Sequence, residues 1–265
     1  YAVGSVFKVI VAAAALEEKL PAAGEFFVCD GSYELGDRQI SCFAGIAHGK
    51  LDLQQALVTS CNGYFVDLAL RLGKEKVVDM AKRFKLGKTT GIPLGGEEAG
   101  NIPEAADLPY GGDVANLAIG QGAVTATPLQ LARVMSILAN QGRDVYPRLV
   151  SKVTDKNGNT VRNYPVQHGS LVVAPALARK LQQMLVPVVE TGTASPAKST
   201  RYRAAGKSGT AQLAGKDYNR SWFAGMVDTG TETLVAVVLL EEHYAGEPTA
   251  SAVFRRLMEA VLDAR

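Results

Sequence analysis

An apolar helix near the N-terminus constrains the fold of this chain more than any other feature. Eight consecutive residues, Val9 to Leu16, carry no polar side chain. A helix that is apolar on all sides packs in the interior of a protein. Lys8 directly precedes this run, so the helix carries a lysine into the core. Unpaired buried lysines are rare, and Lys8 therefore needs a reason to be there.

Ser5 offers that reason. It lies three residues before Lys8, so the two side chains occupy neighbouring positions on one face of a helix. Burial disfavours the charged ammonium, and the neutral amine can remove a proton from a serine hydroxyl. We interpret Ser5 and Lys8 as a nucleophile and its base, with a structural lysine as the alternative. A second Ser-x-x-Lys, at Ser195–Lys198, contains Pro196 and is predicted to be a loop.

A break between two helices follows in the first third of the chain. Asp52 and Gln55 have the spacing of a capping box, and a further helix is predicted over residues 64–72. Ser60 to Gly63 would therefore lie between the two helices. Such a break can direct the Ser60 hydroxyl and the Asn62 amide into a cleft, where Ser60 relays a proton and Asn62 positions a substrate backbone. An ordinary helix-capping serine is the alternative.

A third motif, Lys207-Ser208-Gly209-Thr210, precedes strand-like segments at 221–227 and 234–240, which places it on a strand beside the cleft. Its hydroxyls, the accessible backbone around Gly209 and a fixed charge on Lys207 suit a substrate carboxylate and an acyl oxyanion. A phosphate-binding loop is excluded, because it requires a glycine where Arg201 stands and a helix after the lysine.

Together these motifs resemble the transpeptidase domain of penicillin-binding proteins, and the chain is most similar to the monofunctional, class B type. The resemblance covers essentially the whole chain. Further segments support it: His48-Gly49-Lys50-Leu51, Thr90-Gly91-Ile92, Gly120-Gln121-Gly122, Thr127-Pro128-Leu129-Gln130, Gly192-Thr193-Ala194 and Trp222-Phe223-Ala224-Gly225.

The resemblance assigns a role to each motif residue. It implies that Ser5 is the nucleophile, Lys8 its base, Ser60 the proton relay, Asn62 a contact to the substrate amide, and Lys207, Ser208, Gly209 and Thr210 the group that binds the carboxylate and positions the acyl chain. It also implies an oxyanion hole made by the backbone N–H groups of Ser5 and Thr210.

The resemblance further implies a peptidoglycan D,D-transpeptidase that forms an acyl-serine with the D-alanyl-D-alanine end of a stem peptide and is trapped by β-lactams. No cofactor is expected. The parent protein is expected to be anchored on the extracytoplasmic face of the bacterial membrane, beside a membrane glycosyltransferase. This chain, which begins four residues before Ser5, is expected to be a fragment that lacks an upstream strand hairpin.

Two other functions share these motifs. A serine β-lactamase must also hydrolyse its acyl ester, and Glu97 and Asn101 have the spacing of the residues that do so in one class of these enzymes. The surrounding Gly91-Ile92-Pro93-Leu94 instead resembles the transpeptidase pattern. A penicillin-sensing receptor domain is the second alternative, because such a domain binds β-lactams without cross-linking peptides.

The predicted fold is an α/β sandwich of an antiparallel sheet flanked by helices, similar to that of β-lactamases and transpeptidases. We expect a mostly helical lobe over about 45–145 and a sheet lobe made of about 146–265 together with the N-terminal helix. Within them we expect a helix from Thr127 to Gly142, a hairpin over 149–164, a helix from Pro175 disturbed at Pro187, and a helix over 249–264 that covers the sheet with Val253, Leu257 and Val261.

Composition narrows the range of partners. The 28 basic and 26 acidic residues give a net charge of +2, which argues against a nucleic-acid partner. For a domain outside the cytoplasm, a Cys29–Cys42 disulfide that leaves Cys61 free is one prediction, and reduced cysteines are the alternative. The histidines show no metal-ligand spacing, so no metal is predicted: these are His48, His168 and His243.

Overall fold

The computed structural model describes residues 1–212 and 215–264, and an antiparallel sheet of three strands lies at its centre. The strands are β9 (Arg203–Gln212), β10 (Asn219–Asp228) and β11 (Thr233–His243), in the order β11-β10-β9. β10 is buried from residue 221 to residue 227, as a central strand covered on both faces should be. The predicted strand segments lie within β10 and β11, and the third motif lies within β9.

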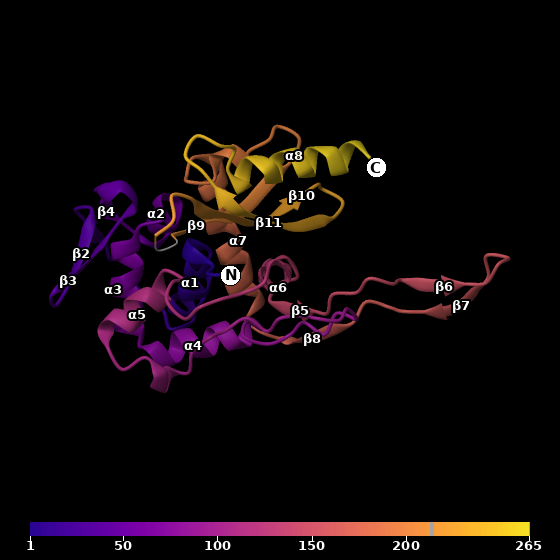
Figure 1. Cartoon of the computed structure of the whole chain (residues 1–265), viewed down its shortest axis with the longest axis horizontal. Helices are drawn as coiled ribbons and strands as arrows, with labels where there is room; N and C mark the ends of the chain where they lie inside the picture. Colours follow the sequence, from indigo (N-terminus) through magenta and orange to yellow (C-terminus); the bar gives the residue numbers. More distant parts are fainter. Residues whose placement is uncertain (213–214, 265) are drawn as a thin grey trace.

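Helices cover both faces of this sheet, as Figure 1 shows. On one face lies α8 (Ala250–Asp263), which packs against β10 and β11. On the other face, α6 (Pro128–Ala139) packs against β10 and β11, and α7 (Pro175–Glu190) packs against β9. α6 had been expected in the helical lobe, but these contacts group it with the sheet.

The helix boundaries agree with the sequence at their N-terminal ends. Thr127 caps α6, with its side chain accepting a hydrogen bond from Gln130 N at 3.1 Å. The helix ends at Ala139, three residues before the predicted stop at Gly142. α7 continues through Pro187 to Glu190 rather than ending at the proline.

The prediction for the buried face of α8 was only partly right, because Val261 packs against the core but Leu257 does not. Val253, Leu257 and Val261 were expected to cover the sheet, yet Leu257 is 43% exposed while Phe254 and Met258 are buried. Both rows of α8 are apolar, so periodicity alone does not distinguish them. Tertiary packing decides, because the ring of Phe254 meets an aromatic ring of β10 with centroids 4.6 Å apart.

The N-terminal helix is buried as predicted, but it begins differently. Residues Gly4–Phe7 form a 3₁₀ turn that leads into α1 (Lys8–Glu17), which packs against α3, α4 and α7. Every residue from Lys8 to Ala15 is buried. The motif formed by Ser5 and Lys8 therefore spans a junction between a 3₁₀ turn and an α-helix.

The helical lobe packs around α1. It contains α2 (Leu53–Thr59), α3 (Asn62–Leu72), α4 (Lys74–Arg83) and α5 (Gly111–Ala118), together with short strand pairs formed by β1 (Phe27–Cys29) with β4 (Gly49–Leu51) and β2 (Ser32–Leu35) with β3 (Arg38–Ser41). Asp52 and Gln55 form the predicted capping box of α2. The break after α2 is shorter than expected, because α3 begins at Asn62.

A long hairpin projects from the body of the molecule (Figure 1). Its strands are β6 (Lys152–Thr154) and β7 (Thr160–Asn163), and they connect through β5 (Arg143–Val145) and β8 (His168–Leu171) to the body. The turn lies within the predicted hairpin, where Gly158 has a φ of 86° that only glycine adopts easily. Within the described residues, no helix has both the length and the apolar character needed to cross a membrane.

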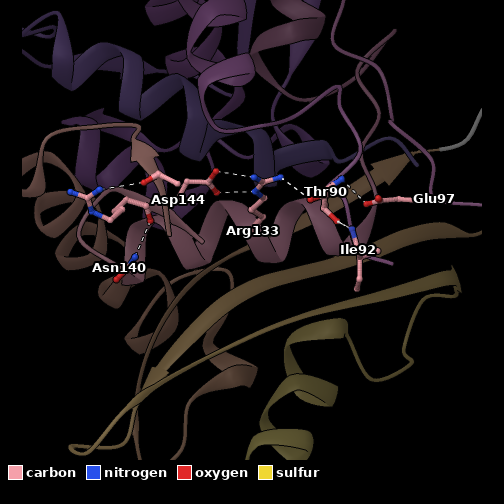
Figure 2. A network of polar contacts seen from close by, with 8 residues as sticks. Thr90, Ile92, Glu97, Arg133, Asn140 and Asp144 are labelled. Atoms are coloured by element: carbon pink, nitrogen blue, oxygen red, sulfur yellow. Dashed lines mark hydrogen bonds and ion pairs between the residues drawn. The ribbon is translucent and has the colours of Figure 1, made fainter. Parts of the chain in front are cut away.

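A buried ion pair fastens the base of this hairpin to α6. Figure 2 shows the guanidinium of Arg133 paired through two 2.8 Å hydrogen bonds with Asp144 of β5. Arg133 also donates to the carbonyl of Thr90 at 3.5 Å and lies 4.9 Å from the ring centroid of Tyr146. Glu97 in turn accepts a hydrogen bond from Thr90 N at 2.7 Å. This network joins three segments that are distant in sequence.

Replacing one partner of this pair should destabilise the fold strongly. Asp144→Ala leaves the Arg133 charge buried without compensation, which costs about 3–5 kcal/mol of unfolding free energy. Urea denaturation followed by circular dichroism measures the change. Glu190→Ala, which breaks the exposed pair with Lys198, is the control and should cost at most about 1 kcal/mol. Equal losses in the two variants would contradict this account.

Candidate active site

A cavity of about 1060 Å³ separates the edge of the sheet from the helical lobe. All three sequence motifs contribute to its wall, although they are far apart along the chain. The motif residues that line it are Ser5, Ser60, Asn62, Ser208, Gly209 and Thr210. Lys8 and Lys207 are fully buried directly behind this surface.

Close backbone packing brings the turn of Ser5 against strand β9. Gly4 has a φ of +55°, and a Cβ there would lie only 2.7 Å from the carbonyl oxygen of Thr210. A Cβ on Gly209 would lie 2.9 Å from the carbonyl oxygen of Val3. From the other side, Gly4 N donates to Gly120 O at 2.9 Å. Glycines therefore hold the backbone of Ser5 and that of Thr210 as near neighbours, as a shared oxyanion hole requires.

Lys8 follows Ser5 by one 3₁₀ turn. The backbone N–H of Lys8 donates to the carbonyl oxygen of Ser5. In a 3₁₀ turn, side chains at positions i and i+3 eclipse one another, so Ser5 and Lys8 share a face more closely than on an α-helix. Ser5 itself is half-buried at the cavity wall.

The hydroxyl of Ser60 lies between two buried amines. Lys8 Nζ is 3.3 Å from Ser60 Oγ, and Lys207 Nζ is 3.0 Å from the same atom. Lys8 Nζ also donates to the carbonyl oxygen of Ser60 at 2.7 Å. Ser60 adopts a left-handed backbone conformation with φ 56°, which is uncommon outside glycine and concentrates at functional sites. This geometry suits a hydroxyl that passes a proton between the cavity and an amine.

The environment of Lys8 favours a neutral amine near pH 7. Burial lowers the pKa of Lys8 to about 7, while the nearby thiols of Cys61 and Cys42 act in the opposite direction. A base is most useful when its pKa lies close to the working pH. This pKa suits Lys8 to act as a base. Its described hydrogen bonds go to Ser60 and Asn62, and none of them reaches Ser5 Oγ.

Lys207 differs from its expected role. It was expected to supply a fixed positive charge to a substrate carboxylate, but its amine points at Ser60 Oγ and at the Ser208 carbonyl oxygen, 3.0 Å away. Burial, followed by repulsion from Lys8, lowers the pKa of Lys207 well below its usual value. Lys207 does not line the cavity, whereas Ser208 and Thr210 of the same strand do.

Asn62 and Thr193 complete the polar edge of the cavity. Asn62 Oδ1 accepts from Lys8 Nζ at 2.6 Å, and Asn62 Nδ2 donates to the Ser41 carbonyl oxygen at 2.8 Å. Ser208 Oγ lies 2.8 Å from Thr193 Oγ1. The segment around Thr193 resembles the family pattern, but the sequence alone indicates no role for its side chain. Its contact with Ser208 adds it to the candidate substrate-binding groups.

The sequence did not reveal that apolar side chains form one wall of the cavity. Ile40, Phe43 and Ile46 line the cavity, and Phe43 and Ile46 are 71% and 53% exposed. They lie on and after β3, in a segment with no regular apolar period. Exposed apolar side chains at a cavity mouth are suited to contact an apolar part of a ligand.

Glu97 and Asn101 do not form a deacylating pair. Neither lines the cavity. Glu97 accepts hydrogen bonds from the backbone N–H groups of Thr90 at 2.7 Å and Gly91 at 3.1 Å, and Asn101 Nδ2 donates to the Ala123 carbonyl oxygen at 2.7 Å. Both side chains fasten loops, which removes the observation that favoured a β-lactamase.

The three cysteines lie together but are free thiols. Cys29 Sγ and Cys42 Sγ are 3.7 Å apart, whereas a disulfide requires about 2.05 Å. Cys61 Sγ is 3.8 Å from Cys42 Sγ, and His48 Nδ1 is 3.4 Å from Cys29 Sγ. The structure thus follows the reduced alternative. The prediction of no metal rested on linear spacing, which did not reveal this cluster.

The assembled site contains the parts needed for acyl transfer through a serine. Ser5 offers a hydroxyl at the cavity wall, Lys8 an amine with a pKa of about 7, and Ser60 a hydroxyl in contact with two amines, while two neighbouring backbone segments could share an oxyanion. None of these parts is a metal ligand or a phosphate-binding loop. Acyl transfer to and from Ser5 is therefore the chemistry that the arrangement supports.

Comparisons with known proteins agree with this chemistry. The model of the penicillin binding protein transpeptidase domain family matches residues 1–259. The chain is 32% identical to the peptidoglycan D,D-transpeptidase MrdA of Acinetobacter baumannii, over 66% of this chain and 28% of that protein. It is 35% identical to the stage V sporulation protein D of Bacillus subtilis, over 80% of this chain and 33% of that protein. The chain thus spans about a third of the length of these relatives.

Solved structures are similar over the full chain. The D,D-transpeptidase domain of a peptidoglycan glycosyltransferase from Eggerthella lenta has a TM-score of 0.89 and 28% identity, covering 100% of this chain and 66% of that one. Penicillin-binding protein A from Mycobacterium tuberculosis, solved as an imipenem acyl-enzyme complex, has a TM-score of 0.88 and 26% identity over 99% of this chain and 60% of that one. With its three motifs gathered around one cavity, the chain belongs to the penicillin-binding protein transpeptidase domain family.

Proposed function

We propose that the protein of which this chain is part is a peptidoglycan D,D-transpeptidase that is acylated and inhibited by β-lactams. The observation that carries the proposal is the contact of the buried Lys8 and Lys207 amines with Ser60 Oγ, directly behind the cavity that exposes Ser5. The chemistry of this site requires an acyl donor. From the resemblance to the family we infer that the donor is a stem peptide that ends in D-alanyl-D-alanine.

Acylation proceeds through a tetrahedral oxyanion. The neutral amine of Lys8 takes the Ser5 proton as Ser5 Oγ attacks the carbonyl carbon of the penultimate residue. The backbone N–H groups of Ser5 and Thr210 stabilise the oxygen that becomes negative. The C–N bond to the terminal D-alanine then breaks, and its amine leaves with a proton that Ser60 delivers and regains from a lysine.

Transfer to the acceptor reverses these proton movements. An amine of a neighbouring stem peptide loses a proton toward Lys8 as its nitrogen attacks the ester carbonyl. The new C–N bond forms, the bond to Ser5 Oγ breaks, and Ser5 regains its proton. Ser208 and Thr210 bind the donor carboxylate during the first half, while Asn62 and the strand backbone align the peptide.

The proposal extends to location and partners. The site uses extracellular cell-wall peptides, so we place it on the extracytoplasmic face of the bacterial membrane. A membrane glycosyltransferase that supplies the glycan strands is the expected partner of the whole protein. Both statements come from the resemblance to class B relatives.

A labelled penicillin should acylate Ser5 and no other residue. Incubation with a fluorescent penicillin, followed by proteolysis and mass spectrometry, locates the adduct. Ser5→Ala should abolish labelling, whereas Ser195→Ala, which changes the second Ser-x-x-Lys motif, should leave it unchanged. A label on another residue of the folded protein, or none at all, would refute the assignment of the nucleophile.

Acylation should accelerate as the pH rises through about 7. The base is the neutral amine of Lys8, whose pKa of about 7 means that its reactive fraction grows about tenfold per pH unit below 7 and levels off above it. The second-order rate constant for penicillin acylation, measured between pH 5 and pH 9, checks this. Circular dichroism over the same range controls for unfolding. A rate that is constant from pH 5.5 to pH 8 would exclude Lys8 as the base.

Two further assays separate the enzyme from its alternatives. A transpeptidase should convert a D-alanyl thioester donor in the presence of a D-amino acid acceptor, and a receptor domain should not. Its penicilloyl-enzyme should persist for many minutes, because Glu97 and Asn101, which have the spacing of a water-activating pair, do not line the cavity. Loss of the label within seconds would favour the β-lactamase.

A further inference from the structure

Four metal-ligand side chains meet beside the break between α2 and α3 that carries Ser60 and Asn62. They are Cys29 at the end of β1, Cys42 after β3, His48 before β4 and Cys61 before α3, and their ligand atoms all lie within 4.8 Å of one another. The three cysteines are buried and His48 is half-buried. None of the four has a part in the acyl-transfer chemistry described above.

Three of the six separations between the ligand atoms match the edges of a coordination tetrahedron. Cysteine sulfur binds zinc at about 2.3 Å and histidine nitrogen at about 2.0–2.1 Å, so tetrahedral geometry places two sulfurs about 3.8 Å apart and sulfur and nitrogen about 3.6 Å apart. The observed distances are 3.7 Å for Cys29–Cys42, 3.8 Å for Cys42–Cys61 and 3.4 Å from Cys29 to His48. Three thiolates with one imidazole form a set that is common for structural zinc and unsuited to calcium or magnesium.

We propose that Cys29, Cys42, His48 and Cys61 bind one zinc ion, which fixes the mouth of the active site. The four protein ligands complete a tetrahedron, so the ion has no open position for a substrate or water and its role is structural. Zinc binding replaces the thiol protons, which pass to solvent, and involves no change of oxidation state.

The ligands connect the ion to the catalytic groups. Cys61 lies between Ser60 and Asn62, so holding its sulfur fixes the strained turn that places both side chains. Cys42 follows Ser41, whose carbonyl oxygen accepts the amide of Asn62 at 2.8 Å. The ion therefore holds both ends of a contact that orients Asn62.

The same ion anchors the apolar wall of the cavity. Cys42 and His48 lie at the two ends of a loop that carries Phe43 and Ile46, both exposed at the cavity mouth. Apart from one 3₁₀ turn at Phe43–Gly45, this loop has no regular structure. Two ligands at its ends position the loop where hydrophobic packing does not.

Metal content tests the site directly. The protein is purified under reducing conditions with zinc and then freed of excess metal. Inductively coupled plasma mass spectrometry should then find one zinc ion per chain. Substitution with Co²⁺ should give the strong visible absorption of a tetrahedral cobalt thiolate. His48→Ala and Cys29→Ser should each weaken zinc binding at least about tenfold, while His168→Ala, a histidine on β8, should not.

Acylation measures the coupling to the active site. Removal of zinc by a chelator should slow the reaction of Ser5 with fluorescent penicillin by about 10–100-fold, and added zinc should restore it. Circular dichroism of the chelated protein and of His48→Ala separates loss of the ion from global unfolding. An unchanged rate after complete removal would overturn the coupling.

Absence of bound zinc and of the cobalt spectrum in folded, reduced protein would overturn the site itself. A Cys29–Cys42 or Cys42–Cys61 disulfide in protein purified with zinc, found by mass spectrometry without reduction, would do the same. The zinc and cobalt measurements do not require peptide cross-linking. They therefore distinguish failure of this proposal from failure of the proposed function.

Discussion

The burial of two lysine amines against one serine hydroxyl is the interaction on which the site depends. Lys8 arrives on a core helix and Lys207 on the central sheet, and both contact Ser60 Oγ. Each amine is desolvated, and Lys8 further disfavours the charged form of Lys207. Protons at this point are therefore held weakly enough to move near neutral pH. Burial is the main cause and repulsion between the two amines adds to it for Lys207, and within residues 1–212 and 215–264 no carboxylate pairs with either amine.

Backbone contacts set the geometry around these amines. Glycines at positions 4 and 209 allow the 3₁₀ turn of Ser5 to lie directly against β9, which a side chain at either position would prevent. The sheet is held in turn by α6, α7 and α8 on its two faces. The core thus positions the backbone N–H groups of Ser5 and Thr210, to which the proposed mechanism gives the oxyanion.

Motif chemistry was more predictable from the sequence than side-chain surroundings were. Ser5, Lys8 and Ser60 could be identified because their spacing and flanking apolar residues indicate a buried helix and a break. The contact of Lys207 with Ser60 was not visible, because it joins residues 147 positions apart. The buried row of α8 was only partly identified because Val253 and Phe254 begin two equally apolar rows, and only the aromatic contact with β10 distinguishes them. The cluster of three cysteines and His48 was not predicted either, because its members come from four separate segments of the chain.

The close packing around Gly4 has a consequence for how this site can vary. A side chain at position 120 would collide with the carbonyl of Gly4, and one at position 4 would collide with β9, so the nucleophile turn is confined from two sides. Substitutions that change the affinity for a β-lactam are therefore expected on surfaces that can vary without moving this turn. The loop of Phe43 and Ile46 is such a surface, since its side chains face open space at the cavity mouth. Within one cavity, substitutions should be tolerated poorly at Gly4 and Gly120 and well at Phe43 and Ile46.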